Sequence, residues 1–292
     1  MTSSVSGVGV VSIALALMCG MLAGCTASTS QLQRARALDR WQVEAVVGTS
    51  IPLSAAAFRA AVKAIDTLEP RVLDAEQGGQ PLAEDEARQL VRAGLSVLLF
   101  TPTPLNELSA RLGLGGGFDV GLRLSGPRTQ FDAKWQFLRA EQAGVDMALS
   151  LAVGRHDSPA ESLWSKAYGI AEKLKFAGYE RTDLSAALLA SRDFGEWASL
   201  YGGGLWMHSL LTISTILDES VVDTGVQTND LVDPGALDQI GGFAGFRVGY
   251  RYVWLSIELS VTRALFAPTV LGQTVDLSGW MVAPSIALVG RF

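Results

Sequence analysis

The sequence predicts an all-β fold, an antiparallel up-and-down β-barrel of about ten strands that crosses a membrane. Three observations predict it. Apolar and polar residues alternate over runs of about ten residues, the length of a tilted strand that spans a bilayer. The polar positions hold mostly small side chains with single charges between them. The 292-residue chain is 49% hydrophobic and only 18% charged, whereas about a quarter of the residues in soluble domains are charged.

The alternation divides the chain into ten predicted strands: 41–53, 95–114, 117–126, 128–140, 144–154, 181–191, 195–215, 238–249, 252–265 and 276–292. One face of the third is Phe118, Val120, Leu122 and Leu124, and the other carries charge and glycine. An even number of strands brings both ends of the barrel to one side. Short connections such as 115–117 fit tight turns, and long connections fit outward loops.

Three segments have a helical period instead, and we expect them in outward loops. They are residues 55–76, 82–92 and 158–178; Ser158 and Glu161 of the last form a capping box at its start. Residues 218–238 are acidic and lack an apolar period, so we expect a mobile outward loop there. The barrel domain is therefore residues 41–292, with helical insertions near 55–92 and 158–178.

Charge and cysteine content exclude several classes of site. The net charge is −6 and no cluster of Lys or Arg is visible, so we expect no nucleic-acid partner. Cys19 and Cys25 are the only cysteines, and His156 and His208 the only histidines. We therefore expect no disulfide, no metal site and no cofactor. Adjacent strand residues point to opposite faces, so His208 cannot easily act with Ser209, and no enzyme is predicted.

The N-terminus has the pattern of an export signal. Residues 8–22 form an apolar run of signal-peptide length, followed by Leu22, Ala23, Gly24 and Cys25. These four residues resemble the lipobox of bacterial lipoproteins, which implies a signal peptide over 1–24 and a palmitate-bearing lipid on Cys25. An ordinary signal peptide is the alternative, because no Lys or Arg precedes the apolar run. Thr26, in place of Asp, favours the outer membrane, and residues 25–40 are then a lipidated tether.

The last strand alternates to the end of the chain, which closes on Phe292. It resembles the signal read by the outer-membrane barrel assembly machinery, so Phe292 is the predicted assembly signal. The glycine-rich and Tyr-Arg-Tyr turns between alternating strands are similar to those of barrels widespread in Gram-negative outer membranes. The resemblance implies a cell outer-membrane protein that contacts the lipid bilayer and the assembly machinery. Aromatic residues near several strand ends would form a girdle at the lipid interfaces, and core packing is the alternative. They are Trp41, Trp135, Trp197, Trp206, Trp254, Trp280, Tyr201, Tyr250 and Tyr252.

Projecting the alternation inward predicts a lumen network of nearly balanced charge. Its acids are Glu44, Glu107, Asp119, Asp132, Asp146 and Glu258, and its bases are Arg111, Arg123, Lys134, Arg247 and Arg291. Such a balance favours a lumen closed by ion pairs and hydrogen bonds, because an unpaired buried charge is costly. The same charges lining a narrow selective path for a small solute are the alternative.

The sequence therefore predicts a small outer-membrane barrel lipoprotein with a structural or narrow, porin-like transport role. Two rivals remain. One is a soluble, lipid-anchored periplasmic barrel that binds an apolar ligand inside; its apolar strand faces would point inward. The other is an outer-membrane hydrolase that depends on His156 or His208. The oligomeric state is not indicated.

Overall fold

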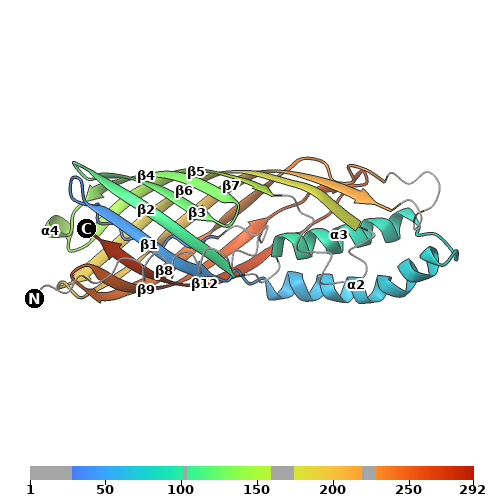
Figure 1. Ribbon diagram of the computed structural model, residues 1–292, viewed down its shortest axis with the longest axis horizontal. Helices are drawn as coiled ribbons and strands as arrows, with labels where there is room; N and C mark the ends of the chain where they lie inside the picture. The colour runs from blue at the N-terminus through green and yellow to red at the C-terminus, as the bar shows by residue number, and fades with distance from the viewer. Residues whose placement is uncertain (1–27, 101–103, 159–173, 219–221, 223–227) are drawn as a thin grey trace, which may run out of the picture.

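A computed structural model of the chain describes residues 28–100, 104–158, 174–218, 222 and 228–292. Ten strands form a closed antiparallel barrel (Figure 1), which confirms the predicted fold. The strands are β1 (Val43–Ser50), β2 (Leu105–Gly115), β3 (Phe118–Ser125), β4 (Arg128–Leu138), β5 (Asp146–Ser158), β6 (Leu174–Phe194), β7 (Ala198–Leu217), β8 (Gly235–Tyr250), β9 (Val253–Leu265) and β12 (Gly279–Arg291). β1 pairs with β12 and closes the ring, and Val43 and Phe292 exchange two backbone hydrogen bonds of 2.9 Å at its edge.

The two ends of the barrel differ in their connections. One, the turn end, holds the β2–β3, β4–β5, β6–β7 and β8–β9 turns, the short helix α4 (Ala140–Ala143) and the C-terminus (Figure 1). Gly115, Gly116 and Gly117 all have positive φ in the β2–β3 turn, a conformation that L-residues with a Cβ rarely adopt. The other, the helix end, carries α2 (Ala55–Glu76), α3 (Glu84–Phe100) and the strands β10 (Thr269–Val270) and β11 (Gln273–Thr274).

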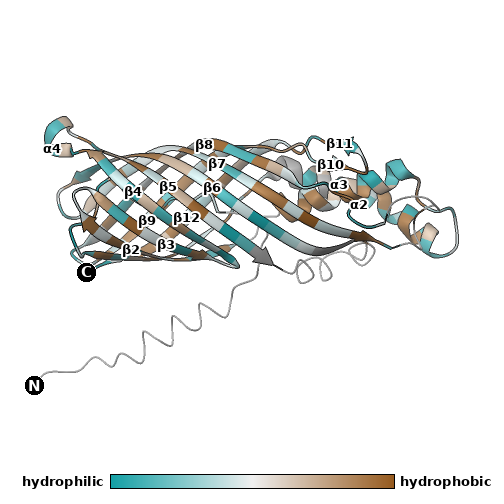
Figure 2. Cartoon of the chain, turned by 90° about the horizontal axis from the view of Figure 1, so that it is seen from above, coloured by the Kyte–Doolittle hydropathy of each residue, from teal (hydrophilic) through white to brown (hydrophobic). Residues whose placement is uncertain are grey.

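The outer wall of the barrel is apolar and its inner wall is polar. Hydrophobic and hydrophilic residues alternate along the strands (Figure 2). On β5, Leu151 is 53% exposed, whereas its neighbour Ser150 is 4% exposed. Every barrel strand turns large apolar side chains outward in this way, and a closed ring leaves no backbone edge unpaired. Such a wall is suited to hydrocarbon. A soluble carrier of an apolar ligand would need the opposite arrangement.

Exposed aromatic residues gather at the turn end of the outer wall. Trp41, Trp135, Trp197, Tyr250 and Tyr252 are each more than a third exposed there, the position of an interfacial girdle. Two aromatic residues that the sequence assigned to the girdle lie inside instead. Tyr201 is 3% exposed and bonds Ser256 at 2.8 Å, and Trp254 lies beneath the Arg291 guanidinium at 5.0 Å.

The α2–α3 hairpin covers the helix end. Buried residues of α3, among them Leu90 and Leu98, share one apolar cluster, which we call the cap cluster, with Leu211, Ile213 and Met281 of the strands. The two helices are also joined by an ion pair between Arg71 and Glu86 at 3.0 Å, and the hydrogen bond from this arginine lowers the pKa of Glu86. None of the helices in the described ranges is long and apolar enough to cross a membrane.

Three element boundaries differ from the predicted ones. Residues 95–100 end α3 instead of opening a strand, because all six are buried and five of them belong to the cap cluster. Predicted helix 158–178 is not one helix: Ser158 ends β5 and residues 174–178 open β6, since the β5–β6 ladder continues to Ser158 and Tyr179. Residues 159–173 lie outside the described ones.

The predicted mobile loop at 218–238 also differs in part. Leu231 and Val232 are buried in the cap cluster, and Val232 forms a bridge with Val270. β8 already begins at Gly235. The described part of this segment is therefore packed against the helix end, because two apolar residues in the acidic run find a buried site.

Substitution of one outward residue tests the lipid-facing wall. Leu149 lies beside the girdle residue Trp135, whereas Val153, four residues further along β5, points outward away from the girdle and is 52% exposed. We therefore expect Val153→Arg to cost about 2–4 kcal/mol of folding free energy in a bilayer. Ser150→Ala is the control at an inward-facing position of the same strand, and it should cost under about 1 kcal/mol. Denaturant titrations in lipid vesicles measure both; equal midpoints would contradict the facing.

Candidate functional site

The lumen is occupied by residues 28–40, which we call the lumen segment. The sequence predicted that 25–40 is a tether outside the barrel; residues 28–40 instead run through it. The Ser28 hydroxyl bonds that of Ser50, the last residue of β1, at 3.0 Å. At the turn end, the Trp41 N–H donates to Gly113 at 2.8 Å. The segment therefore runs from the helix half of the lumen to the turn end, where the chain turns back into β1.

Basic side chains of the barrel bind the carbonyl oxygens of the lumen segment. Arg123 donates to the carbonyls of Ser30 and Gln31 at 2.6 and 2.7 Å. Arg247 donates to that of Leu32 at 2.9 Å. Lys134 donates to those of Arg34 and Arg36 at 3.0 and 3.3 Å, and Arg128 to that of Ser28 at 3.3 Å. Four cations from β3, β4 and β8 thus bind the main chain.

Acidic and polar side chains bind the N–H groups of the same segment. Glu258 accepts the N–H groups of Gln31 and Leu32, each at 2.7 Å. Ser191, Gln136 and Asp119 accept those of Ala35, Ala37 and Leu38 at 3.1, 2.8 and 3.3 Å. Residues 28–40 belong to no strand, and buried backbone groups need partners. The lumen charges supply these partners, which an adjacent strand would supply in a sheet.

The remaining bonds of the predicted network join barrel residues to one another. Arg111 pairs with both Asp119 and Asp132, and Lys134 also pairs with Asp119 at 3.1 Å. Gly121 makes room for this cluster, because a Cβ there would lie 2.5 Å from an Asp132 oxygen.

Nearer the turn end, Glu44 pairs with Arg247 and with Arg291, each at 2.9 Å. In the helix half, beside Ser50, Glu107 accepts a hydrogen bond from that residue at 3.1 Å and lies 3.9 Å from Arg123. Asp146 has a different role: it accepts hydrogen bonds from Gln136 and from the Ala140 N–H, at 2.7 and 2.8 Å, and so holds the β4–β5 turn.

Sequence reasoning missed a second buried cluster in the helix half of the lumen. Asp183 pairs with Arg128 at 2.9 Å and with Arg181 at 2.5 Å, and it accepts a hydrogen bond from Ser209 at 2.6 Å. Arg128 shares the inward parity of Lys134, so continuing the alternation to the start of β4 would have found it. It also missed Arg34 and Asp193, which pair at 2.7 Å between the lumen segment and β6, because the lumen segment has no periodic pattern.

The two histidines lie in different environments. His156 is inside the lumen and 1% exposed, with its ring against that of Tyr179. His208 lies on the outer wall and pairs with Asp238 at 2.9 Å. In the part of the chain that the structure describes, no group of three His, Cys, Asp or Glu side chains could hold a metal ion.

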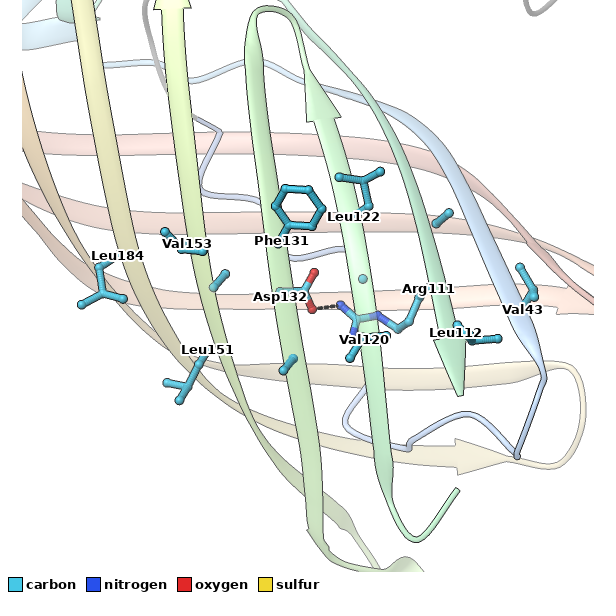
Figure 3. A pocket seen from close by; sticks show the side chains of 14 residues that line it. Val43, Arg111, Leu112, Val120, Leu122, Phe131, Asp132, Leu151, Val153 and Leu184 are labelled. Carbon is cyan, nitrogen blue, oxygen red and sulfur yellow. Dashed lines mark hydrogen bonds and ion pairs between the residues drawn. The ribbon is translucent and has the colours of Figure 1, made fainter. Parts of the chain in front are cut away.

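A shallow apolar hollow lies on the outer wall over β1 to β6 (Figure 3). Leu122, Phe131 and Leu151 flank it, and small residues such as Ala110 and Ala133 form its floor. The ion pair between Arg111 and Asp132 belongs to the lumen side of the same wall. This hollow faces the hydrocarbon, so it is a feature of the lipid-facing surface and not an entrance to the lumen.

Comparison with known proteins finds no matching family model and no matching curated protein. Among solved structures, the chain is similar to the Neisserial surface protein A, with 8% identity, a TM-score of 0.33, and coverage of 86% of this chain and 97% of that one. It is similar to a major outer membrane protein from Thermus thermophilus, with 12% identity, a TM-score of 0.32, and coverage of 86% of this chain and 99% of that one. It is also similar to OprG from Pseudomonas aeruginosa, with 8% identity, a TM-score of 0.31, and coverage of 89% of this chain and 99% of that one. These distant likenesses concern barrel architecture and carry over no activity.

Loss of one clamping side chain should loosen the lumen segment. Ser30 is fully buried, so a thiol introduced by Ser30→Cys should react slowly with a maleimide when Cys19 and Cys25 are both replaced by Ser. Adding Arg123→Ala removes two charge-assisted hydrogen bonds to the segment and should raise the labelling rate at least about tenfold. Arg263→Ala, on the exposed outer wall, is the control. Equal rates in the two variants would show that Arg123 does not hold the segment.

Proposed function

We propose that this protein is an outer-membrane barrel with a structural role: a closed, non-conducting barrel that anchors the α2–α3 hairpin at the outward surface. The observation that carries the proposal is the lumen segment, whose main chain is hydrogen-bonded by the inner wall along its length. Long connections of such barrels face outward and short turns face the periplasm. The helix end is therefore the outward one.

Two seals of different chemistry support a closed barrel. In the turn half, the lumen segment occupies a charged interior, with Arg123 and Glu258 bound to its main chain. At the helix end, α3 packs with Leu211 and Ile213 in an apolar cluster. A barrel of ten strands encloses little more space than side chains fill. A solute would have to displace the first seal and then pass the second.

A narrow selective pathway is the second candidate function. The polar inner wall favours it, because removal of the lumen segment would leave Arg123, Lys134, Arg247 and Glu258 facing water-accessible space. In this reading the segment is a gate, and a small polar solute passes only when the segment leaves.

The proposal includes lipidation of Cys25 after removal of residues 1–24, and recognition of Phe292 by the barrel assembly machinery. The lipobox and the alternating terminal strand support these steps.

The proposal includes no enzymatic activity. His156 lies in the lumen and His208 on the outer wall, so the two histidines cannot share one site. Ser209 bonds Asp183 and Arg181 at 2.6 and 2.8 Å, which holds its hydroxyl in the buried ion-pair cluster. The carboxylate beside it, Asp183, is itself engaged by Arg128 and Arg181.

Conductance in planar bilayers separates the two candidate functions. We expect the wild type to be electrically silent. Deletion of residues 28–40 should leave conductance low while the apolar cap remains, and the same deletion combined with replacement of residues 55–100 by a short Gly-Ser link should give stable channels. Regular channel openings by the wild type would overturn the structural role and favour transport.

Lipidation is tested by labelling cells with palmitate. The wild type should incorporate the label and Cys25→Ser should not, because the thiol is the proposed acyl acceptor. Cys19→Ser, within the proposed signal peptide, is the control and should be labelled as the wild type is. Label that persists in Cys25→Ser would rule out a lipid at this residue.

A further inference from the structure

The inner wall contacts the lumen segment chiefly through its main chain. Arg123, Arg128, Lys134 and Arg247 bind carbonyl oxygens, and Glu258, Ser191, Gln136 and Asp119 bind N–H groups. Side-chain contacts to the segment are fewer; they include Thr29 to Ser260 at 2.8 Å and Arg34 to Asp193 at 2.7 Å. Main-chain groups are the same in every peptide, proline aside. A wall built this way recognises an extended main chain, and side chains matter where the channel leaves little room for them.

We propose that the lumen is a binding channel for an extended polypeptide, and that residues 28–40 occupy it as an intramolecular ligand which a separate peptide of the same chemistry replaces. The inference goes beyond a structural role, and it does not depend on the lipid. It assigns binding, not conduction, to the charged lumen residues.

Three positions of the segment define the peptide that fits. Ser30 and Ala35 are both fully buried, so the channel accepts only small side chains there. Leu32 packs with Val46 and Val289 and has a φ of 48°, which places a bend and an apolar side chain at this position. Gln31, between Ser30 and Leu32, is partly exposed, and Arg36, directly after Ala35, is exposed, so both positions tolerate exchange.

The bend is held on both sides by charge. Glu258 accepts the N–H groups of two successive residues, Gln31 and Leu32, and Arg247 donates to the carbonyl of Leu32. An opposed acid and base thus bind the two backbone groups of a single residue. Hydrogen bonds to charged groups are stronger than neutral ones, so this position contributes strongly to peptide binding.

The experiment uses the full chain with Cys25→Ser, so that no acyl group retains the N-terminal piece, and with a protease site inserted between Arg40 and Trp41, both exposed at the turn end. After cleavage in detergent micelles, the N-terminal piece is held only by the lumen. A fluorescein-labelled synthetic peptide of residues 28–40 is then added in excess, and its binding is followed by anisotropy and size-exclusion chromatography. We expect the peptide to exchange with the cleaved piece and to saturate at one per barrel.

Two results would overturn the proposal. If the cleaved piece leaves and the labelled peptide does not bind, the channel has no affinity for a free peptide. If the cleaved piece stays and no exchange occurs over days, the segment is an inseparable part of the fold. The uncleaved chain, which keeps its own segment at high effective concentration, is the control and should bind little labelled peptide.

Peptides N-methylated at single residues test main-chain recognition. Methylation at Leu32 removes the N–H that donates to Glu258 and should weaken competition at least about tenfold. Methylation at Gln33, whose N–H makes no hydrogen bond within the described residues, should weaken it less. Equal loss from both would contradict main-chain recognition. If the wild type forms channels and the cleaved barrel still binds the labelled peptide, the proposed structural role is wrong and the peptide-binding channel is supported.

Discussion

The need to pair every buried main-chain group governs this molecule. In hydrocarbon a strand cannot leave its N–H and C=O groups unbonded, and the pairing of β1 with β12 satisfies this need by closing the ring. The same need recurs inside the ring, where residues 28–40 have no strand beside them. There, side chains such as Arg123 and Glu258 take the place of a neighbouring backbone. The lumen charges thus serve a second chain segment as well as one another.

The interior is divided by chemistry along the barrel axis. Toward the turn end, Arg111, Asp119 and Lys134 form a charged cluster around the lumen segment. Toward the helix end, Leu211 and Ile213 of β7 face inward and meet α3. The lumen therefore receives an extended segment with many peptide groups where its wall is charged, and an amphipathic helix where Leu211 and Ile213 make its wall apolar.

The sequence was sufficient to predict the barrel and which side chains point into its lumen, because the pleat of a strand directly imposes a period of two. The inward positions of Asp119, Arg123 and Lys134 follow from that period alone. It was not sufficient for the lumen segment: a polar stretch such as 28–40 reads equally as a tether in water or as a ligand in a polar lumen. The end of α3 was also misassigned, since the largely apolar run at 95–100, with Ser96 as its one polar residue, fits a buried helix as well as a strand.

The position of residues 28–40 inside a closed ring also constrains the order of assembly. Their partners come from β3, β4, β6, β8 and β9, so the segment contacts strands from most of the ring. A free N-terminus could pass through a finished ring, but one that carried acyl chains would be too bulky to thread. For an acylated chain, the β1–β12 seam would have to close around a segment already in place, so that the last strand completes the ring around residues 28–40.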